Sequence, residues 1–427
     1  MEYKITKNDT DILRKIAKRK MEIANNPVNL KRKELWKALH DLKPKRPMVL
    51  AEHGGIRDKK KPFEPVIECD EKWAQNVETQ LKEEIWRFEF LRDDYCIEPY
   101  FSINWILNVS NYGVEPITHQ VDADYMTSRR WDAPITDIKR DFHKLHPRTY
   151  SVDREETMTY KKILEDVFEE IMPVTIRRPL WWTMGTTITA INLIGLENLM
   201  LFMYDDPEGL HQLMRFLNDD HIAFVKWLKK EGLLSLNNKN EYVGSGSIGY
   251  VSALPSSNYK KDNPVSTKDM WVLLESQETV GVGSTLFEEF VFRYQEEIAK
   301  EFGLVYYGCC EPVHTRWNVI SKLNNLRAVS IAPLCNQEIM ADKMRNKYVF
   351  SRKPNPTLIS TEKFNEELII NDIKDTFKLA EKYGLCLELI MKDVHTLSNQ
   401  PERLAKWIKM AKDVIGAAEY SFPAESK

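Results

Sequence analysis

Strand-like and helix-like segments alternate along most of this chain, and that alternation restricts the fold more than any other feature. Short apolar runs rich in Val, Ile, Leu and Tyr recur from residue 47 onward, and amphipathic helical segments separate them. Strands that are joined through helices run parallel, with right-handed crossovers. The number of repeats favours a closed (β/α)8 barrel over an open sheet, so we expect an α/β fold of the TIM-barrel type.

The chain divides into three expected parts. Residues 1–45 are rich in Lys and Arg and have a helical pattern, which predicts an N-terminal helical extension with a solvated charged face. Residues 46–418 form the expected (β/α)8 barrel and catalytic domain, and residues 419–427 form an expected loose tail. Within the barrel, residues 108–155 are irregular, and loops of that length are often lids or binding segments; polar residues in it are His119, Asp122, Asp124, Arg129 and Arg130.

Composition excludes several classes of function. The net charge of −3 provides no basic surplus, so we expect no nucleic-acid partner. The first residues contain no apolar core of a secretory signal, and no run approaches the ~18 apolar residues of a membrane span. We therefore expect a cytoplasmic protein that does not bind a membrane. Its six cysteines are expected to be free thiols rather than disulfides.

Sulfur and a carboxylate follow an apolar strand directly at Cys309, Cys310 and Glu311. The run that precedes them, residues 304–308, is typical of a buried strand, and Pro312 ends it because proline has no N–H for the ladder. A second strand-like run, residues 326–334, ends in Cys335. Parallel strands bring their carboxyl ends to one edge, so the pattern suggests a soft-metal site there. The alternative, that these thiols only pack beneath the rim, stays open.

Further candidate residues stand at other strand ends. Asp393 and His395 follow the last strand and are spaced to form a base and its orienting partner. Glu278 also follows a strand and is a candidate proton donor. His53 precedes two glycines that would let the backbone approach a ligand closely. Each has a plainer explanation as a loop residue, and Cys309 and Cys310 should face opposite sides of their strand, so that only one points inward.

Three segments carry a resemblance to a known family: YYGCCEP, LELIMKDVHTL and QPERLAKW. They resemble the uroporphyrinogen decarboxylase superfamily, and within it the branch of corrinoid-dependent methyltransferases. That branch binds zinc through a His-x-Cys pair and a later Cys. Here Gly308 stands at the position of the His, Cys310 matches the Cys, and Cys335 is the expected later ligand. Of the basic residues that meet substrate carboxylates in the decarboxylases, Arg57 and nearby lysines remain.

The resemblance implies an enzyme that moves a methyl group between a small methylated substrate and a corrinoid protein. The implied zinc ligands are Cys310, Glu311 and Cys335, the catalytic residues Glu278, Asp393 and His395, and the substrate-binding residues His53, Arg57 and Cys309. The chain lacks a complete cobalamin-carrier motif, so the corrinoid is expected on a separate partner protein. Barrels of this superfamily often pair, which makes a homodimer possible.

Two other functions stay open at this stage. The first is a metal-independent decarboxylase or lyase acting on a small carboxylated substrate, with Asp393, His395 and Arg57 at its centre. The second is a barrel without enzymatic activity that binds a small ligand or a partner. Loss of carbon dioxide without any corrinoid would favour the first, and tolerance of substitutions at Cys310, Glu311 and Asp393 would favour the second.

Overall fold

A computed structural model describes residues 3–120, 129–178 and 180–416. Its core is a six-stranded parallel sheet in the order β1-β14-β13-β12-β11-β10. The strands are β1 (Met48–Ala51), β10 (Trp271–Leu274), β11 (Leu304–Tyr307), β12 (Leu326–Ile331), β13 (Val349–Arg352) and β14 (Cys386–Met391). The expected α/β class and parallel strands are confirmed.

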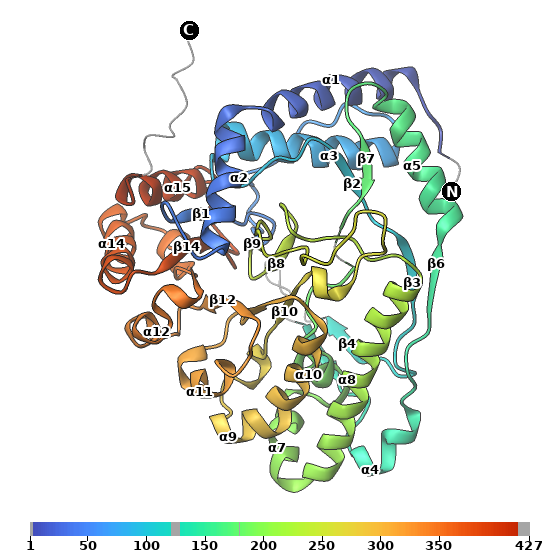
Figure 1. Ribbon diagram of the computed structural model, residues 1–427, viewed down its shortest axis with the longest axis vertical. Coiled ribbons are helices and arrows are strands. Elements are labelled where there is room, and N and C mark those ends of the chain that lie inside the picture. Colours follow the sequence, from blue (N-terminus) through green and yellow to red (C-terminus); the bar gives the residue numbers. More distant parts are fainter. Residues whose placement is uncertain (1–2, 121–128, 179, 417–427) are drawn as a thin grey trace.

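Helices cover the outer side of this sheet (Figure 1). They connect successive strands and are α9 (Ser284–Phe287), η5 (Glu288–Phe292), α10 (Arg293–Glu301), α11 (Trp317–Ile320), α12 (Gln337–Met344), α13 (Thr357–Ser360), α14 (Glu366–Tyr383) and α15 (Arg403–Val414). Helix α14 shows why such segments form where they do. Asn365 caps its first turn by accepting a hydrogen bond from Leu368 N, and Gly384 ends it in the left-handed conformation at φ 65°.

A second parallel pair, β2 (Phe101–Ile103) and β7 (Val174–Ile176), lies apart from the six strands in the hydrogen-bond pattern. Helix α3 (Lys72–Trp86), with its π-helical end η1 (Arg87–Leu91), precedes β2, and α5 (Arg154–Val167) precedes β7. One backbone bond, from Met184 N to Leu273 O at 3.0 Å, joins the segment after β7 to β10. In the described residues the ladders do not run continuously through eight strands, so closure of the expected barrel is not shown by backbone pairing.

Side chains rather than a strand cover the outer edge of β1. The carboxylate of Asp94 accepts a hydrogen bond from Val49 N at 2.9 Å, and that of Asp93 accepts one from Ala51 N at 3.4 Å. Arg46 binds both oxygens of Asp94, and Lys412 of α15 adds a contact at 2.9 Å. Because three positive side chains face Asp94, its pKa is held far below its usual value despite full burial, which opposes that shift. This seam ties β1 to α15.

The segment expected to be irregular, residues 108–155, contains short elements. They are the end of β3 (Ile106–Val109), β4 (Ile117–Gln120), β5 (Arg129–Asp132), α4 (Ile138–Asp141), η2 (Phe142–Lys144), β6 (Tyr150–Asp153) and the start of α5. Strands β3 and β6 pair antiparallel, as do β4 and β5. In this segment His119 binds Asp132 at 2.7 Å, whereas Asp122 and Asp124 lie outside the described residues.

The remaining elements lie between β7 and β13. They are α6 (Thr187–Ile194), α7 (Leu196–Asp205), α8 (Pro207–Lys230), β8 (Tyr242–Gly244), β9 (Ser247–Ile248), and the short 3-10 turns η3 (Thr267–Asp269), η4 (Gln277–Thr279), η6 (Val313–Thr315) and η7 (Arg345–Lys347). Among the described residues no single helix is long and apolar enough to cross a membrane. The bent pair α6 and α7, at 92°, meets that test only when the two are taken together.

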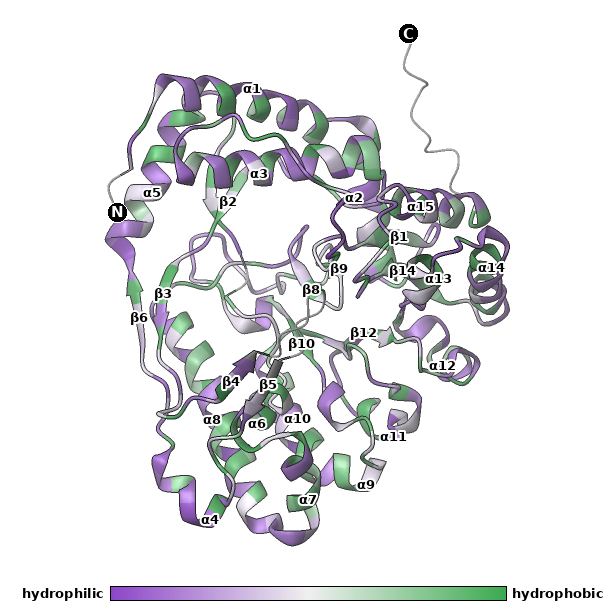
Figure 2. Cartoon of the chain, turned by 180° about the vertical axis from the view of Figure 1, so that it is seen from behind, coloured by the Kyte–Doolittle hydropathy of each residue, from purple (hydrophilic) through white to green (hydrophobic). Residues whose placement is uncertain are grey.

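The N-terminal helices α1 (Lys7–Ala24) and α2 (Pro27–His40) pack against the main fold (Figure 1). Both alternate between hydrophilic and hydrophobic residues along their length (Figure 2). On α1, Leu13 and Ala17 join Leu81 of α3 in one buried cluster. On α2, Trp36 and Leu39 belong to the cluster that fills the inner side of the sheet. The expected helical extension is therefore helical, and it contributes to the core. The expected tail, residues 419–427, lies outside the described residues.

Candidate functional site

Polar groups gather at the carboxyl end of the six-stranded sheet, beginning with two adjacent thiols after β11. Gly308 ends β11 in the left-handed region at φ 94°, where a side chain would be strained. The chain turns there, and the sulfur atoms of Cys309 and Cys310 come to lie 3.6 Å apart. The expectation that these two side chains face opposite ways is wrong, because the strand has already ended and its alternation no longer applies.

The two thiols differ in environment and in charge. Cys309 is 4% exposed, whereas Cys310 is exposed to solvent. The hydrogen bond from Cys310 lowers the pKa of Cys309; burial opposes the shift and the ammonium of Lys392 adds to it. Donating that bond raises the pKa of Cys310. Of the two thiols, Cys309 is therefore the more acidic.

Lys392, directly after β14, is the cation of this centre. Its Nζ lies 3.5 Å from Cys309 Sγ, 3.5 Å from Ser245 Oγ and 3.2 Å from an Asp393 carboxylate oxygen. Burial alone would lower the pKa of Lys392, yet Cys309, Asp393 and Glu52 raise it above its ordinary value. Lys392 therefore stays protonated, and its ammonium favours the ionised form of Cys309.

A second lysine, Lys353, lies deeper on the inner side of the sheet. It follows β13, is 2% exposed, and donates hydrogen bonds to Tyr306 Oη at 2.9 Å and to Ser351 O at 3.2 Å. Burial lowers the pKa of Lys353 to about 7, and the charge of Lys392 contributes, while Glu388 opposes the shift. An amine of this kind is present both protonated and neutral near pH 7, so it can give or take a proton.

Buried carboxylates complete the surroundings. Glu388, in the middle of β14, accepts a hydrogen bond from Ser247 Oγ at 2.8 Å, and its other oxygen has no partner within the described residues. Burial raises the pKa of Glu52, after β1. Burial also raises the pKa of Glu275, after β10, and the neighbouring Glu278 and Glu311 add to that shift. The centre thus combines a thiol of lowered pKa, two lysines, and two carboxyl groups of raised pKa, Glu52 and Glu275.

The expected zinc ligands do not come together. Glu311 accepts hydrogen bonds from Ser276 N at 2.9 Å and Cys309 N at 2.8 Å, so its carboxylate holds two strand ends. Burial raises the pKa of Cys335 to about 11. In the described part of the chain, no three His, Cys, Asp or Glu side chains are placed to hold one metal ion. A zinc site needs at least three protein ligands, so the residues present do not fit that ion.

His314, three residues after Glu311, is also engaged elsewhere. Its Nδ1 accepts a hydrogen bond from Asn336 N at 3.2 Å. Where the resemblance predicts a metal ion next to Cys310, the nearest positive charge is the Lys392 ammonium, which contacts both Cys309 and Asp393. An ammonium in this place stabilises a thiolate without a metal.

The other expected residues surround the centre to different degrees. Asp393 belongs to it, because its carboxylate accepts a hydrogen bond from Cys310 Sγ at 3.6 Å. His395 is exposed, and its carbonyl accepts a hydrogen bond from the exposed Arg57 at 2.9 Å, so the two loops meet at the rim. His53 binds Glu83 of α3 at 3.0 Å, and Glu278 accepts a hydrogen bond from Thr187 at 2.7 Å. Among the described residues, none of these four, His395, Arg57, His53 and Glu278, forms a hydrogen bond or ion pair with Cys309.

Sequence reasoning missed Lys353, Lys392, Glu52 and Glu388. A signal for two of them is present in CLELIMKD, residues 386–393, where Glu388 interrupts an apolar strand and Lys392 ends it. A charged residue in a fully buried strand needs a partner, which makes it a marker of a polar centre. Lys353 gave no comparable signal, because it stands in the polar run Arg352-Lys353-Pro354.

Comparisons with known proteins give limited information. No protein-family model and no curated protein matches this chain. A solved structure, a methyltransferase from Methanosarcina mazei, is similar at a TM-score of 0.46 and 11% sequence identity, and covers 90% of this chain and 98% of its own. Membership of the uroporphyrinogen decarboxylase superfamily stays a prediction from the sequence motifs.

Proposed function

We propose that the protein is an enzyme that transfers a methyl group from a small methylated substrate, with the Cys309–Lys392 pair as its reacting centre. The observation that carries the proposal is the contact of 3.5 Å between the Cys309 sulfur and the Lys392 ammonium. A thiolate is a strong, soft nucleophile, and a methyl carbon is a soft electrophile. Burial keeps water away from the sulfur, which makes the thiolate more reactive toward a bound substrate.

The proposed step needs no metal, because this chain's own residues supply the nucleophile and the proton. The sulfur lone pair of Cys309 forms a bond to the methyl carbon, and the bond from that carbon to the leaving group breaks with its electron pair. The leaving group takes a proton from Lys353, whose pKa near 7 lets it donate at neutral pH. Lys392 keeps Cys309 deprotonated before the step, and Asp393 holds the Lys392 ammonium in place.

A corrinoid protein is the proposed partner that receives the methyl group from Cys309: the S–CH3 bond would break with its electron pair left on the sulfur, and the Lys392 ammonium would stabilise the restored thiolate. The corrinoid, when bound, supplies a cobalt centre that carries methyl groups. The docking face would be the carboxyl end of the strands, where exposed apolar side chains follow β7, β10 and β12: Trp182, Val280 and Leu334. Exposed apolar groups around a polar centre are typical of a protein contact surface.

We also infer that the six-stranded sheet and the β2–β7 pair together form one (β/α)8 barrel. Six and two strands give the eight of that fold. The bond from Met184 N to Leu273 O supports one junction, and the Asp93–Asp94 side chains fill the other. A cytoplasmic location and a homodimer stay predictions, and sedimentation equilibrium of the purified protein would test the latter.

The test follows methyl transfer to free cob(I)alamin by its absorbance change, with methylated thiols, methylated amines and methoxybenzenes as donors. We expect turnover with at least one donor. The rate of methyl transfer should fall by about 100-fold or more in Cys309→Ser, because the nucleophile is gone, and should be normal in the control Cys335→Ser. Absence of turnover with every donor, or equal rates in Cys309→Ser, contradicts the proposal. Metal analysis of the same samples, together with Cys310→Ser, tests the predicted zinc.

A metal-independent decarboxylase is the second candidate, and the two buried lysines favour it. Lys353 and Lys392 can neutralise a substrate carboxylate and the negative charge that develops when carbon dioxide leaves. The residues expected for this function, Asp393, His395 and Arg57, lie at the exposed rim and would hold the substrate instead. The protein would then release carbon dioxide from a carboxylated substrate. Loss of this activity in Lys353→Met, together with an unchanged rate in Cys309→Ser, would support the decarboxylase function.

A further inference from the structure

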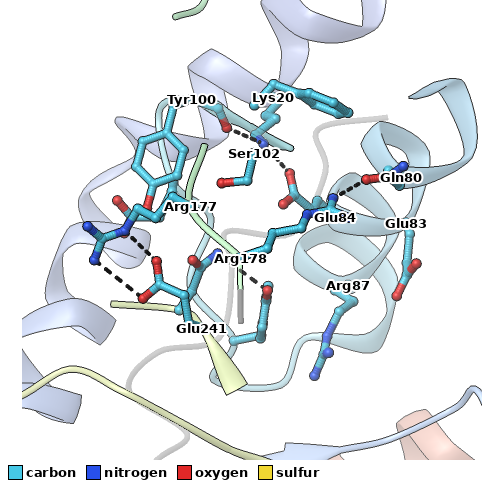
Figure 3. A pocket seen from close by; sticks show the side chains of 14 residues that line it. Lys20, Gln80, Glu83, Glu84, Arg87, Tyr100, Ser102, Arg177, Arg178 and Glu241 are labelled. Atoms are coloured by element: carbon cyan, nitrogen blue, oxygen red, sulfur yellow. Dashed lines mark hydrogen bonds and ion pairs between the residues drawn. The ribbon is translucent and has the colours of Figure 1, made fainter. Parts of the chain in front are cut away.

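A separate cavity of about 290 Å³ lies between the N-terminal helices and the β2–β7 pair (Figure 3). Its volume is at the lower end of those that hold small molecules in proteins. Helices α1 and α3 form one wall, and β2 with the segments after β7 and before β8 forms the other. The side chains that line it are mostly charged or hydroxylated, and include Lys20, Glu84, Tyr100, Ser102, Arg178 and Glu241.

Most charges in this cavity are already neutralised by a partner. Lys20 pairs with Glu84 and also donates to Tyr100 O at 2.7 Å. Arg177 binds Glu241, as Figure 3 shows. Glu98 is bound by Lys33 at 2.9 Å and by Lys239 at 3.4 Å. These pairs build a rigid polar wall and leave little charge for a ligand to neutralise.

Arg178 is the exception. It is exposed, donates to Gln80 across the cavity (Figure 3), and forms no ion pair with the described residues. The nearby carboxylate of Glu83 is already bound by His53 at 3.0 Å. A guanidinium has five N–H donors in a planar fork, so Arg178 has donors left for a carboxylate with two oxygens.

A buried hydroxyl group faces the same cavity without a partner. Tyr100 is 8% exposed, and its Oη forms no hydrogen bond with the described residues. Arg177 lies beside it, but donates to Glu241 and, at 2.7 Å, to Asn238 instead. Ser102, on β2, has only a weak contact of 3.5 Å with Thr175. Buried polar groups are nearly always paired, so the Tyr100 hydroxyl indicates a missing partner, and the half-buried Ser102 hydroxyl can form a further hydrogen bond.

We propose that this cavity binds a small hydroxycarboxylate, with its carboxylate on Arg178 and its hydroxyl group on Tyr100 and Ser102. A ligand of this kind supplies both missing partners at once: two acceptor oxygens at the entrance and one donor or acceptor inside. The site is separate from the Cys309–Lys392 centre, so the inference does not depend on methyl transfer.

The experiment is isothermal titration of the full chain with glycolate, 3-hydroxypropanoate and 4-hydroxybutanoate. Butanoate, which lacks the hydroxyl group, and 1,4-butanediol, which lacks the carboxylate, are the matched comparison compounds. We expect at least one hydroxycarboxylate to bind more tightly than both. Arg178→Gln should weaken binding by about 10- to 100-fold, because a hydrogen bond to a charged group is lost, and Tyr100→Phe by several-fold.

Arg345→Gln and Tyr204→Phe are control variants that remove the same groups from exposed positions elsewhere. Both should bind like the unaltered protein, and circular dichroism checks that all four variants fold. The inference is overturned if none of the hydroxycarboxylates binds, if butanoate binds equally well, or if binding survives both Arg178→Gln and Tyr100→Phe.

Discussion

At the scale of single residues, the Cys309 sulfur and the Lys392 ammonium set each other's protonation state. Either charged group would be unfavourable without the other, because burial disfavours a charge that has no partner. At their contact of 3.5 Å, the ammonium adds to the Cys310 hydrogen bond in lowering the pKa of Cys309, and the sulfur raises the pKa of Lys392 against the effect of burial. Cys309 is therefore expected to be the reactive thiol, although Cys310 is the exposed one.

Replacing Lys392 by Met should slow alkylation of Cys309 by iodoacetamide about 10-fold at pH 7, because an opposite charge nearby shifts a pKa by one unit or more. The rate should rise with pH in both proteins, and its midpoint should lie at a higher pH in Lys392→Met than in the unaltered protein. Peptide mass spectrometry measures the rate at each cysteine. Lys378→Met, on the surface of α14, is the control, and an unchanged pH profile in Lys392→Met would contradict the assignment.

Lys353 should give the protein a stability that rises with pH. The folded-state pKa of about 7 lies below the unfolded value of Lys, so the unfolded chain binds more protons between the two values. The free energy of unfolding should therefore increase from pH 7 toward pH 10, by at most about 1.4 kcal/mol per pH unit from this group. Urea titrations at several pH values measure the slope, which should be smaller in Lys353→Met. Equal slopes in the two proteins would show that the pKa of Lys353 is not lowered in the folded state.

The sequence predicted part of this centre and could not predict the rest. Cys309, Cys310 and Asp393 were found because they directly follow apolar strands, a local pattern. Lys353 and Lys392 matter because of neighbours that are far along the chain, such as Tyr306 and Cys309. Cys335 was misjudged for the same reason: a strand end indicates an edge of the sheet, but not which way the side chain points after it.

At the scale of elements, the seam at β1 depends on one buried carboxylate. Asp94 binds the backbone of Val49 and the cations of Arg46 and Lys412. Local patterns predicted β1 itself, along with the other five strands of the sheet. They could not predict that side chains would replace strand pairing on its outer edge, because the partners come from distant parts of the sequence.

Asp94→Asn should lower the free energy of unfolding at pH 7 by about 3–5 kcal/mol, the usual cost of leaving buried charges without a partner. The pKa of Asp94 is depressed in the folded state, so its contribution is present above the usual Asp value and is lost as the pH falls below it. Urea denaturation at pH 7 and pH 3 measures both effects. The difference between the two proteins should shrink at pH 3, while Asp413→Asn on the exposed side of α15 should have little effect.

At the scale of the whole molecule, the N-terminal helices contribute to the core of the main fold. Trp36 of α2 is fully buried in the cluster that contains Met48 and Leu50 of β1. The charge-rich sequence of residues 1–45 predicted two helices correctly but suggested a separate extension, because the buried positions are outnumbered by Lys and Arg.

Trp36→Ala should therefore lower the free energy of unfolding by about 3–5 kcal/mol, as truncation of a buried aromatic residue usually does. Leu30→Ala, on the exposed face of the same helix, should change it by less than about 0.5 kcal/mol. Thermal unfolding followed by circular dichroism compares the two. Similar values for both variants would show that α2 packs only loosely.

The outer edge of β1 has one more consequence. A wall closed by strand pairing can be widened only by moving whole strands, whereas the Asp93–Asp94 seam combines a backbone bond, from Asp94 N to Val49 O at 2.8 Å, with side-chain contacts that substitutions can change. The hydroxylated cavity lies along this same stretch of wall, next to Arg87, whose guanidinium binds both Asp93 and the β1 carbonyl of Ala51. Substitutions at Asp93 or Arg87 are thus expected to change the shape of this cavity while Cys309 and Lys392 keep their positions.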